Sequence, residues 1–204
     1  MNTQRIEQNN LDLAISLIND GKIVAFPTDT VYGLGCLYDN IDAINAIKLA
    51  KGRDENKPLP MMCANKEMIV NVAYVNDIAR KIIDKLMPGA LTIVLKRKDT
   101  VKDYVTNGKD TIAIRIPDHK LVLEILNKVN KPMLVTSANL SDYPSGHHDY
   151  EVINQLDGKI DGIVMGSSCA ELASTIVLVE DNGYKILRQG KITDEKLKNV
   201  LEGD

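Results

Sequence analysis

Residues 22–35 read Lys-Ile-Val-Ala-Phe-Pro-Thr-Asp-Thr-Val-Tyr-Gly-Leu-Gly and pass from an apolar run into hydroxyls and glycines. The β-rich residues Lys22–Phe26 predict a short strand, which Pro27 ends because proline donates no hydrogen bond to a sheet. The polar residues that follow then lie just past a strand end, where ligands gather in open α/β sheets. They form either an ordinary turn or, beside backbone that Gly33 and Gly35 leave accessible, a grip on a small polar ligand.

Helix-like and strand-like segments alternate over the 204 residues, so the sequence predicts the α/β class. Late strands come with few helices between them, which favours a twisted, open, mixed β-sheet flanked by helices over an all-parallel sheet. We expect one domain over residues 1–204, with its core at about 10–192. The expected helices follow Asn10, Asn76 and Asp118, run from Ile41 towards Gly52, and run from about Thr193 to Leu201; the expected strands are 22–26, 59–63, 91–95, 111–116, 133–136, 162–165, 175–179 and 185–187.

The composition excludes several classes of protein. A formal net charge of −3 and a pI near 5.7 argue against a general nucleic-acid coat. No apolar run approaches the roughly 20 residues of a membrane helix, and the polar N-terminal segment does not resemble a secretory signal. The three cysteines, Cys36, Cys63 and Cys169, have neither disulfide nor metal-site spacing. We therefore expect a cytoplasmic protein with reduced thiols, without membrane contact and without metal ligands of its own.

The run Lys51-Gly-Arg-Asp-Glu-Asn-Lys57 places three cations in a loop that Pro58 closes. Taken alone, such a run is more often a solvated surface loop than a site. Arg115 and Arg188 change this interpretation, because each ends an apolar strand and is expected to be partly buried, and such an arginine needs an anionic partner. Together these cations predict a positive concave cavity that takes a triphosphate or a carboxylate.

Other polar groups have weaker patterns. The segment Thr136-Ser-Ala-Asn139 follows a predicted strand and either caps the next segment or offers a hydroxyl and an amide to a ligand. His119, His147 and His148 are expected at the surface. The chain contains no P-loop, no complete dinucleotide fingerprint and no GxSxG motif. No general base stands out, which favours nucleotidyl transfer, a chemistry of positioning and charge stabilisation, over hydrolysis.

Seven motifs occur in a fixed order along the chain. They are Phe26-Pro-Thr-Asp-Thr-Val-Tyr-Gly-Leu-Gly35, Lys51-Gly-Arg with Lys57-Pro-Leu59, Pro88-Gly-Ala-Leu-Thr92, Ala113-Ile-Arg-Ile-Pro117, Thr136-Ser-Ala-Asn139, Ser174-Thr-Ile176 and Ile186-Leu-Arg-Gln-Gly190. In this order they resemble the YrdC-like family of threonylcarbamoyl-AMP synthases. The resemblance implies a nucleotidyltransferase with a basic cavity that converts L-threonine, bicarbonate and ATP, with Mg²⁺, to threonylcarbamoyl-AMP and pyrophosphate. It also implies a partner complex that transfers the threonylcarbamoyl group to adenosine 37 of tRNA.

The resemblance further implies roles for individual residues. The positions that hold threonine are Thr30, Met62, Arg115, Ser137 and Ser174. The positions that hold ATP are Arg53, Lys57, Thr111, Asn139, His147 and Arg188. The basic motif assigned to catalysis is Lys51, Arg53 and Lys57, and no residue is assigned to a metal. Met62, Asp142 and His147 stand where many family members have His, Gly and Ser or Thr.

Other interpretations stay open. An RNA-binding module of the same fold would hold double-stranded RNA or tRNA, although the net acidity and the single phenylalanine without tryptophan weigh against it. A carbamoyl-transfer domain, of the kind found in hydrogenase-maturation proteins, would belong to a longer chain with zinc fingers. A paralogue with the same fold would use another amine. Within the family we expect the short form, without the additional C-terminal domain.

Overall fold

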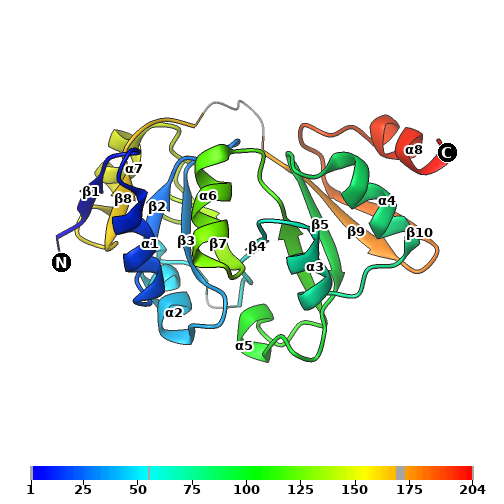
Figure 1. Ribbon diagram of the computed structural model, residues 1–204, viewed down its shortest axis with the longest axis horizontal. Helices are drawn as coiled ribbons and strands as arrows, with labels where there is room; N and C mark the ends of the chain where they lie inside the picture. Colours follow the sequence, from blue (N-terminus) through cyan, green and yellow to red (C-terminus); the bar gives the residue numbers. More distant parts are fainter. Residues whose placement is uncertain (1, 55, 169–172, 204) are drawn as a thin grey trace.

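A ten-stranded mixed sheet runs through the part of the protein that the structure describes (Figure 1). The computed structural model describes residues 2–54, 56–168 and 173–203. The strands are β1 (Gln4–Ile6), β2 (Val24–Phe26), β3 (Gly33–Leu37), β4 (Met61–Met62), β5 (Leu91–Lys96), β6 (Thr111–Arg115), β7 (Met133–Ser137), β8 (Gly162–Val164), β9 (Thr175–Glu180) and β10 (Gly183–Arg188). Their order across the sheet is β1-β8-β2-β3-β7-β4-β6-β5-β9-β10.

Parallel and antiparallel pairs are interspersed across this sheet. The pairs β1–β8, β2–β8, β4–β6 and β5–β9 are parallel, and the pairs β2–β3, β3–β7, β4–β7, β5–β6 and β9–β10 are antiparallel. The predicted α/β class and mixed sheet are therefore confirmed. The short strand β4 joins the two halves, because it pairs with β7 on one side and with β6 on the other.

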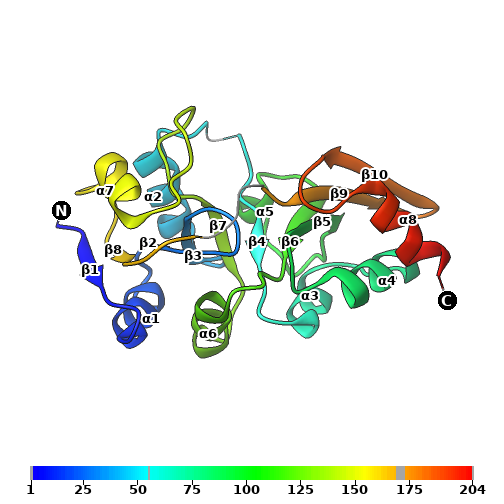
Figure 2. The ribbon, with the colours of Figure 1, turned by 90° about the horizontal axis from the view of Figure 1, so that it is seen from above.

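Helices flank both halves of the sheet. They are α1 (Leu11–Asn19), α2 (Ile41–Lys51), α3 (Lys66–Val72), α4 (Asp77–Leu86), α5 (Asp103–Thr106), α6 (Lys120–Val129), α7 (Asp149–Leu156) and α8 (Asp194–Glu202). Figure 2 shows α1 and α6 together on one side of β2, β3 and β7, with α2 and α7 on the other side. None of the helices in the described ranges is long and apolar enough to cross a membrane.

Alternating residues on the central strands separate the core from an open space. Ile93 on β5 and Ile114 on β6 are fully buried in a core that includes apolar residues of α3 and α4. Their neighbours Val94 and Ala113 are register partners and line a cavity instead. Since successive residues of a strand point to opposite faces, one face of β5 and β6 builds the core and the other is left for a ligand.

Most of the predicted elements are present. The periodic helices, among them α2 capped by Asn40 and α4 capped by Asn76, lie where the apolar spacing predicts them. The helix after Asp118 begins one residue later than predicted, because the Asp118 backbone N–H donates to the carboxylate of Asp29, 3.1 Å away, and His119 is the N-cap. Asn10 precedes α1 but makes no side-chain cap hydrogen bond. The elements that the pattern missed are β1, β3, α3, α5 and α7.

The two glycines of the opening stretch belong to a strand and not to a ligand-binding loop. Gly33 and Gly35 begin and centre the buried strand β3. A Cβ on Gly33 would lie 2.8 Å from Val135, and one on Gly35 would lie 2.9 Å from Met133. Gly33 also lines a cavity, so the alternative that backbone of this stretch meets a ligand stays a prediction. Both glycines let β3 pack closely against neighbouring side chains.

Candidate functional site

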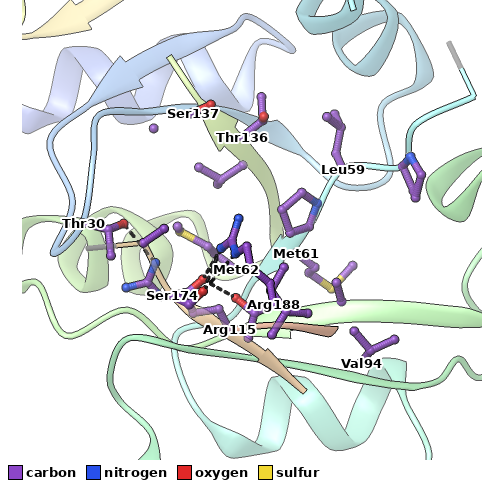
Figure 3. Close-up of a pocket in the computed structure, with 18 of the residues that line it drawn as sticks. Thr30, Leu59, Met61, Met62, Val94, Arg115, Thr136, Ser137, Ser174 and Arg188 are labelled. Carbon is purple, nitrogen blue, oxygen red and sulfur yellow. Dashed lines mark hydrogen bonds between the residues drawn. The ribbon is translucent and has the colours of Figure 1, made fainter. Parts of the chain in front are cut away.

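A cavity of about 590 Å³ lies along the face that β5 and β6 leave open, between the loops that follow β2 and precede β4 (Figure 3). This volume is typical of a small-molecule site. Its floor carries apolar side chains such as Leu59, Met61 and Val94, and Figure 3 shows hydroxyl and guanidinium groups grouped beside them. Apolar walls with a few converging polar groups are the usual lining of a binding site.

Arg115 ends β6 at the cavity and is held from three directions. Its Nη2 donates to Asp29 Oδ2 at 2.5 Å, its Nη1 to Thr30 Oγ1 at 3.1 Å, and its Nε to the Gly89 carbonyl at 3.1 Å. Burial lowers the pKa of Arg115, and Asp29 opposes that shift. The expectation of a buried arginine with an anionic partner is confirmed, but the partner is a protein carboxylate. Two of the five guanidinium N–H groups remain for a ligand.

Asp29 has a position beside Arg115 of the cavity wall that the sequence pattern did not predict. In the sequence it is one polar residue of a possible turn, whereas in the structure its carboxylate joins the end of β6 to the start of α6 through Arg115 and Asp118. Its other oxygen, Oδ1, and His119 Nδ1 are the two buried side-chain polar atoms in the described part of the chain that lack a hydrogen-bond partner. His119 is half-buried rather than exposed as predicted, because it lies at this junction.

A second guanidinium meets the same wall of the cavity. Arg188, the last residue of β10, donates through Nη2 to the Ser174 carbonyl at 2.8 Å and to Ser174 Oγ at 3.1 Å. Ser174 Oγ is also 2.9 Å from Thr92 Oγ1. Burial lowers the pKa of Arg188, and the nearby Arg115 lowers it further. Two guanidiniums that repel each other across a cavity favour an anionic occupant.

Arg188 is more exposed than the sequence predicts. Its strand β10 is at the edge of the sheet and pairs only with β9, so its neighbours cover one side alone. The buried Thr175 hydroxyl fixes the turn that follows, because it donates to the Ile192 carbonyl at 2.7 Å and accepts from the Gly190 and Ile192 N–H groups. The hydroxyl that holds this turn therefore stands directly beside Ser174.

Replacement of Gly190 by alanine is expected to disturb this wall. Its Cβ would lie 2.3 Å from the Ala173 carbonyl oxygen and 2.5 Å from the Ser174 backbone carbon, so the backbone has to move. We expect a loss of ~1–3 kcal/mol in the free energy of unfolding, as for other overpacked sites. Denaturant unfolding measures it. Gly183→Ala is the matched control, because nothing lies within 4 Å of its added Cβ; an equal loss in both variants would contradict the close contact.

Lys51 is buried, and its ammonium is used inside the protein. Nζ donates to the carbonyls of Ser137 and Asn139, the latter at 2.6 Å, and lies 3.4 Å from Asn139 Oδ1. The Lys51 carbonyl in turn accepts from Ser141 N–H at 2.8 Å. Burial, with a contribution from Arg53, lowers the pKa of Lys51 to about 8. These contacts fasten the segment after β7 to the end of α2.

The two other cations of the basic loop differ from each other. Arg53 lines the cavity, and its guanidinium donates to the backbone carbonyls of Pro58 at 3.2 Å and Lys57 at 3.5 Å. Burial lowers the pKa of Arg53, and Asp54 opposes that shift. Lys57 is exposed and lies outside the cavity wall. Arg53 thus both closes its own loop and presents positive charge to the cavity.

The remaining predicted residues divide into two groups. Those that line the cavity are Thr30, Arg53, Met62, Thr111, Arg115, Ser137, Ser174 and Arg188. Those that do not are Lys51, Lys57, Asn139 and His147. The Asn139 amide donates to the carbonyls of Leu140 at 2.7 Å and Tyr143 at 2.8 Å, so it fixes its own loop. His147 is half-buried instead of exposed, and its backbone N–H donates to Glu151 at 2.6 Å, just before α7.

Metal and thiol chemistry have little support in the described residues. They contain no group of three or more His, Cys, Asp or Glu side chains that would hold a metal ion. Cys36 and Cys63 are buried free thiols, and burial raises the pKa of each to about 12, so neither is a nucleophile at neutral pH. Cys169 lies outside the described residues.

The geometry defines a class of protein: an open α/β sheet that carries a cavity lined in part by arginine side chains. Comparison with known proteins is more specific. A model of the Sua5/YciO/YrdC family, described as "Telomere recombination", matches residues 16–190. The chain therefore belongs to the Sua5/YciO/YrdC family.

Several relatives are named after one activity. The chain is 38% identical over 191 residues to a threonylcarbamoyl-AMP synthase of Bacillus subtilis, and the aligned region covers 92% of this chain and 55% of the relative. It is 33% identical over 200 residues to the enzyme of that name from Pyrococcus abyssi, with 97% of this chain and 59% of the relative covered. The chain thus spans little more than half the length of these relatives. A putative threonylcarbamoyl-AMP synthase of Methanocaldococcus jannaschii is 40% identical over 88% of this chain and 85% of its own.

Solved structures agree with this family. P. abyssi Sua5 in complex with L-threonine superposes with a TM-score of 0.91 at 31% identity, over 98% of this chain and 60% of that chain. Escherichia coli YciO superposes with a TM-score of 0.85 at 22% identity, over 96% and 98% of the two chains, and supports the fold. The YrdC-like fold predicted from the ordered motifs is confirmed.

Proposed function

We propose that this protein is an L-threonylcarbamoyladenylate synthase, which joins L-threonine, bicarbonate and ATP into threonylcarbamoyl-AMP and releases pyrophosphate. The observation that carries the proposal is the convergence of Arg115, Arg188 and Ser174 in a cavity that also takes in Arg53. An amino acid and a triphosphate are two anions, and this cavity offers them cations on different elements. The names of the relatives support the same chemistry.

The proposed threonine site is the end of β6. There the threonine carboxylate accepts from the two N–H groups of Arg115 that the protein does not use. Thr30, which hydrogen-bonds to Arg115, and Ser174, which hydrogen-bonds to Arg188, line the same cavity. Met62 is paired with Arg115 in the strand register and presents a thioether to the cavity at this point. Ser137 completes the proposed set from the end of β7.

The proposed ATP site takes the rest of the cavity. Arg53, Thr111 and Arg188 line it and are the contacts that we assign to ATP within the wall. Lys57, Asn139 and His147 lie outside the wall. They can contact ATP only if the nucleotide extends past the wall or the loops that carry these residues move toward it. We also propose that Mg²⁺ arrives bound to the phosphates of ATP, since the described residues contain no group of three metal-binding side chains.

The reaction follows from these positions. Bicarbonate takes up a proton and loses water to give CO₂. The amine of threonine then forms a C–N bond to the carbon of CO₂ and loses a proton, which gives a carbamate. A carbamate oxygen then attacks the α-phosphorus, the bond between the α- and β-phosphates breaks, and pyrophosphate leaves with its electron pair. Arg53 and Arg188 stabilise the negative charge that develops on the phosphates, and Arg115 holds the amino acid in line. Such catalysis needs positioned cations more than a general base.

The test is release of pyrophosphate from labelled ATP in the presence of bicarbonate. Release that depends on L-threonine, together with a product that contains both threonine and AMP, is the expected result. Folded protein that releases none would refute the proposal. A thermal-shift series with ATP and each of the twenty amino acids separates threonine from other amines, because a paralogue would be stabilised most by a different amino acid.

We further propose that the product passes to a tRNA-modifying transferase in the cytoplasm, as the family resemblance implies.

Weak RNA binding is a second candidate, supported by exposed Tyr74, whose ring lies 5.9 Å from the ammonium groups of Lys96 and Lys98. Aromatic rings flanked by cations stack on bases and contact phosphates. Titration with tRNA at several salt concentrations tests it, because affinity that does not fall with salt contradicts phosphate binding at this surface.

A further inference from the structure

The turn after α5 brings one more cation to the cavity. Lys109 lines the cavity together with Thr106, Thr111 and Arg53, although it matches none of the seven sequence motifs. Four cationic side chains line the cavity among the described residues, namely Arg53, Lys109, Arg115 and Arg188. Of these, Arg115 alone forms an ion pair with a described carboxylate. Lys109 therefore adds charge that the described residues do not neutralise.

The backbone around Lys109 is firmly held. Asn107 and Gly108 take the left-handed conformation, with φ of 53° and 74°, and end α5 abruptly. The Lys109 carbonyl accepts from Thr106 Oγ1 at 2.8 Å and from Arg97 Nε at 2.9 Å, and its N–H donates to the Thr106 carbonyl at 3.2 Å. The turn is thus fixed by hydrogen bonds on three sides, while the lysine side chain projects from it.

The same turn is tied to the helix that leads to the basic loop. Lys48 Nζ, on α2, donates to Asn107 Oδ1 at 3.1 Å. The next turn of α2 ends at Gly52, and Arg53 follows it directly. This hydrogen bond connects the turn that carries Lys109 to the helix whose C-terminus precedes Arg53. Lys109 and Arg53, from different elements, both line the cavity.

An exposed lysine is usually only a solvated charge. Lys102, at the start of α5, is such a residue, since it is exposed and is absent from the cavity wall. Lys109 differs because hydrogen bonds fix the backbone of its turn and because the residue lines the cavity. The structure has no described carboxylate in ion-pair contact with it. A lysine ammonium with these properties is a binding group for a phosphate.

We propose that Lys109 is a phosphate-binding residue of the cavity, acting beside Arg53 on the polyphosphate of the nucleotide. The assignment to ATP rests on the proposed function, whereas binding of a polyphosphate by Lys109 does not. The ligand class is a di- or triphosphate. An ammonium acts on it as a point charge, so arginine should replace lysine with small loss.

The experiment measures the dissociation constant of inorganic pyrophosphate by calorimetry, with no other substrate present. Lys109→Ala is expected to weaken binding about tenfold, the effect of one charge-assisted hydrogen bond of ~1.4 kcal/mol. Lys109→Arg should bind within about twofold of wild type, and Lys102→Ala should not change binding. In turnover, Lys109→Ala should raise KM for ATP and leave KM for threonine unchanged, and its thermal midpoint should match that of Lys102→Ala.

The outcomes separate this inference from the proposed function. Unchanged pyrophosphate affinity in Lys109→Ala, or an equal loss in Lys102→Ala, would overturn the role of Lys109. A wild-type protein that does not bind pyrophosphate would overturn it as well. If wild type binds pyrophosphate through Lys109 but forms no product from threonine, the inference holds and the proposed function fails.

Discussion

Replacement of Arg115 by methionine is expected to remove product formation and to lower the free energy of unfolding by ~3–5 kcal/mol, the usual cost of leaving one partner of a buried ion pair alone. Both side chains of the pair with Asp29 are nearly covered, with exposed fractions of 7% and 11%. Methionine fills much of the space but offers no charge, so Asp29 stays buried without its cation. Denaturant unfolding and pyrophosphate release measure the two effects.

A second substitution separates stability from activity. In the double variant with Asp29→Asn, no uncompensated charge remains, while the amide oxygen can still accept from the Asp118 N–H that Asp29 now binds. We expect the free energy of unfolding to recover in part, whereas product formation should stay lost at threonine concentrations near the KM of wild type, because the threonine carboxylate still lacks its guanidinium. KM for threonine should rise about 100-fold, as two charge-assisted hydrogen bonds of ~1.5 kcal/mol each are lost.

Lys128→Met is the control for this pair. Lys128 contacts Asp12 at 3.1 Å on the surface, with exposed fractions of 47% and 85%. Surface pairs of this kind contribute about 0–1 kcal/mol. If the Arg115 variant loses no more stability than Lys128→Met, or if the double variant recovers none, then the buried Asp29 charge is not the cause of the loss.

The sequence predicts the elements of this fold best where its periodicity is long. The helix α4 repeats apolar residues over ten positions and has an asparagine cap, so its bounds follow from the pattern. The pattern does not predict β3, because two of its five residues are glycines and glycines usually indicate a turn. The segment forms a strand because it pairs with β7, about one hundred residues away, whose Val135 and Met133 side chains pack against its glycines.

The candidate site follows a similar division. Arg115, Arg188 and Ser174 are recognisable because they lie at the ends of apolar strands, and they meet in one cavity. Lys109 has no such signal, since its place depends on the left-handed turn at Asn107 and on a tie to α2. Which cations point inward is a tertiary property. The basic loop shows this most clearly, because its three cations have three different environments.

Lys51 is where that difference has the largest consequence. The family resemblance assigns this residue to catalysis. Its ammonium, however, donates hydrogen bonds to the carbonyls of Ser137 and Asn139, and the residue is not part of the cavity wall. Lys51→Met would remove the donor from the buried Asn139 carbonyl, whereas the Ser137 carbonyl would keep the Asn139 N–H at 3.1 Å. At ~1–3 kcal/mol for an unsatisfied buried group, we expect a loss of ~1–3 kcal/mol in the free energy of unfolding. Exposed Lys22, replaced by methionine, should show almost none.

The pH dependence of stability provides an independent measure. Burial lowers the pKa of Lys51 from its usual 10.5 to about 8. Between these values the unfolded chain keeps the proton that the folded protein has released. The unfolded state therefore binds more protons, and the contribution of Lys51 to the free energy of unfolding rises with pH across this window. The difference in free energy between wild type and Lys51→Met should accordingly widen from pH 8 towards 10.5.

These measurements distinguish a positioning role from direct contact with ATP. If Lys51 holds the segment that carries Ser137, the methionine variant loses stability and turnover together, and its pyrophosphate affinity changes little. If instead turnover and pyrophosphate affinity fall while the free energy of unfolding stays that of wild type, then the ammonium leaves its carbonyls and contacts the phosphates during the reaction. The geometry favours the first result, because an ammonium that reaches a phosphate must first abandon the acceptors that end β7.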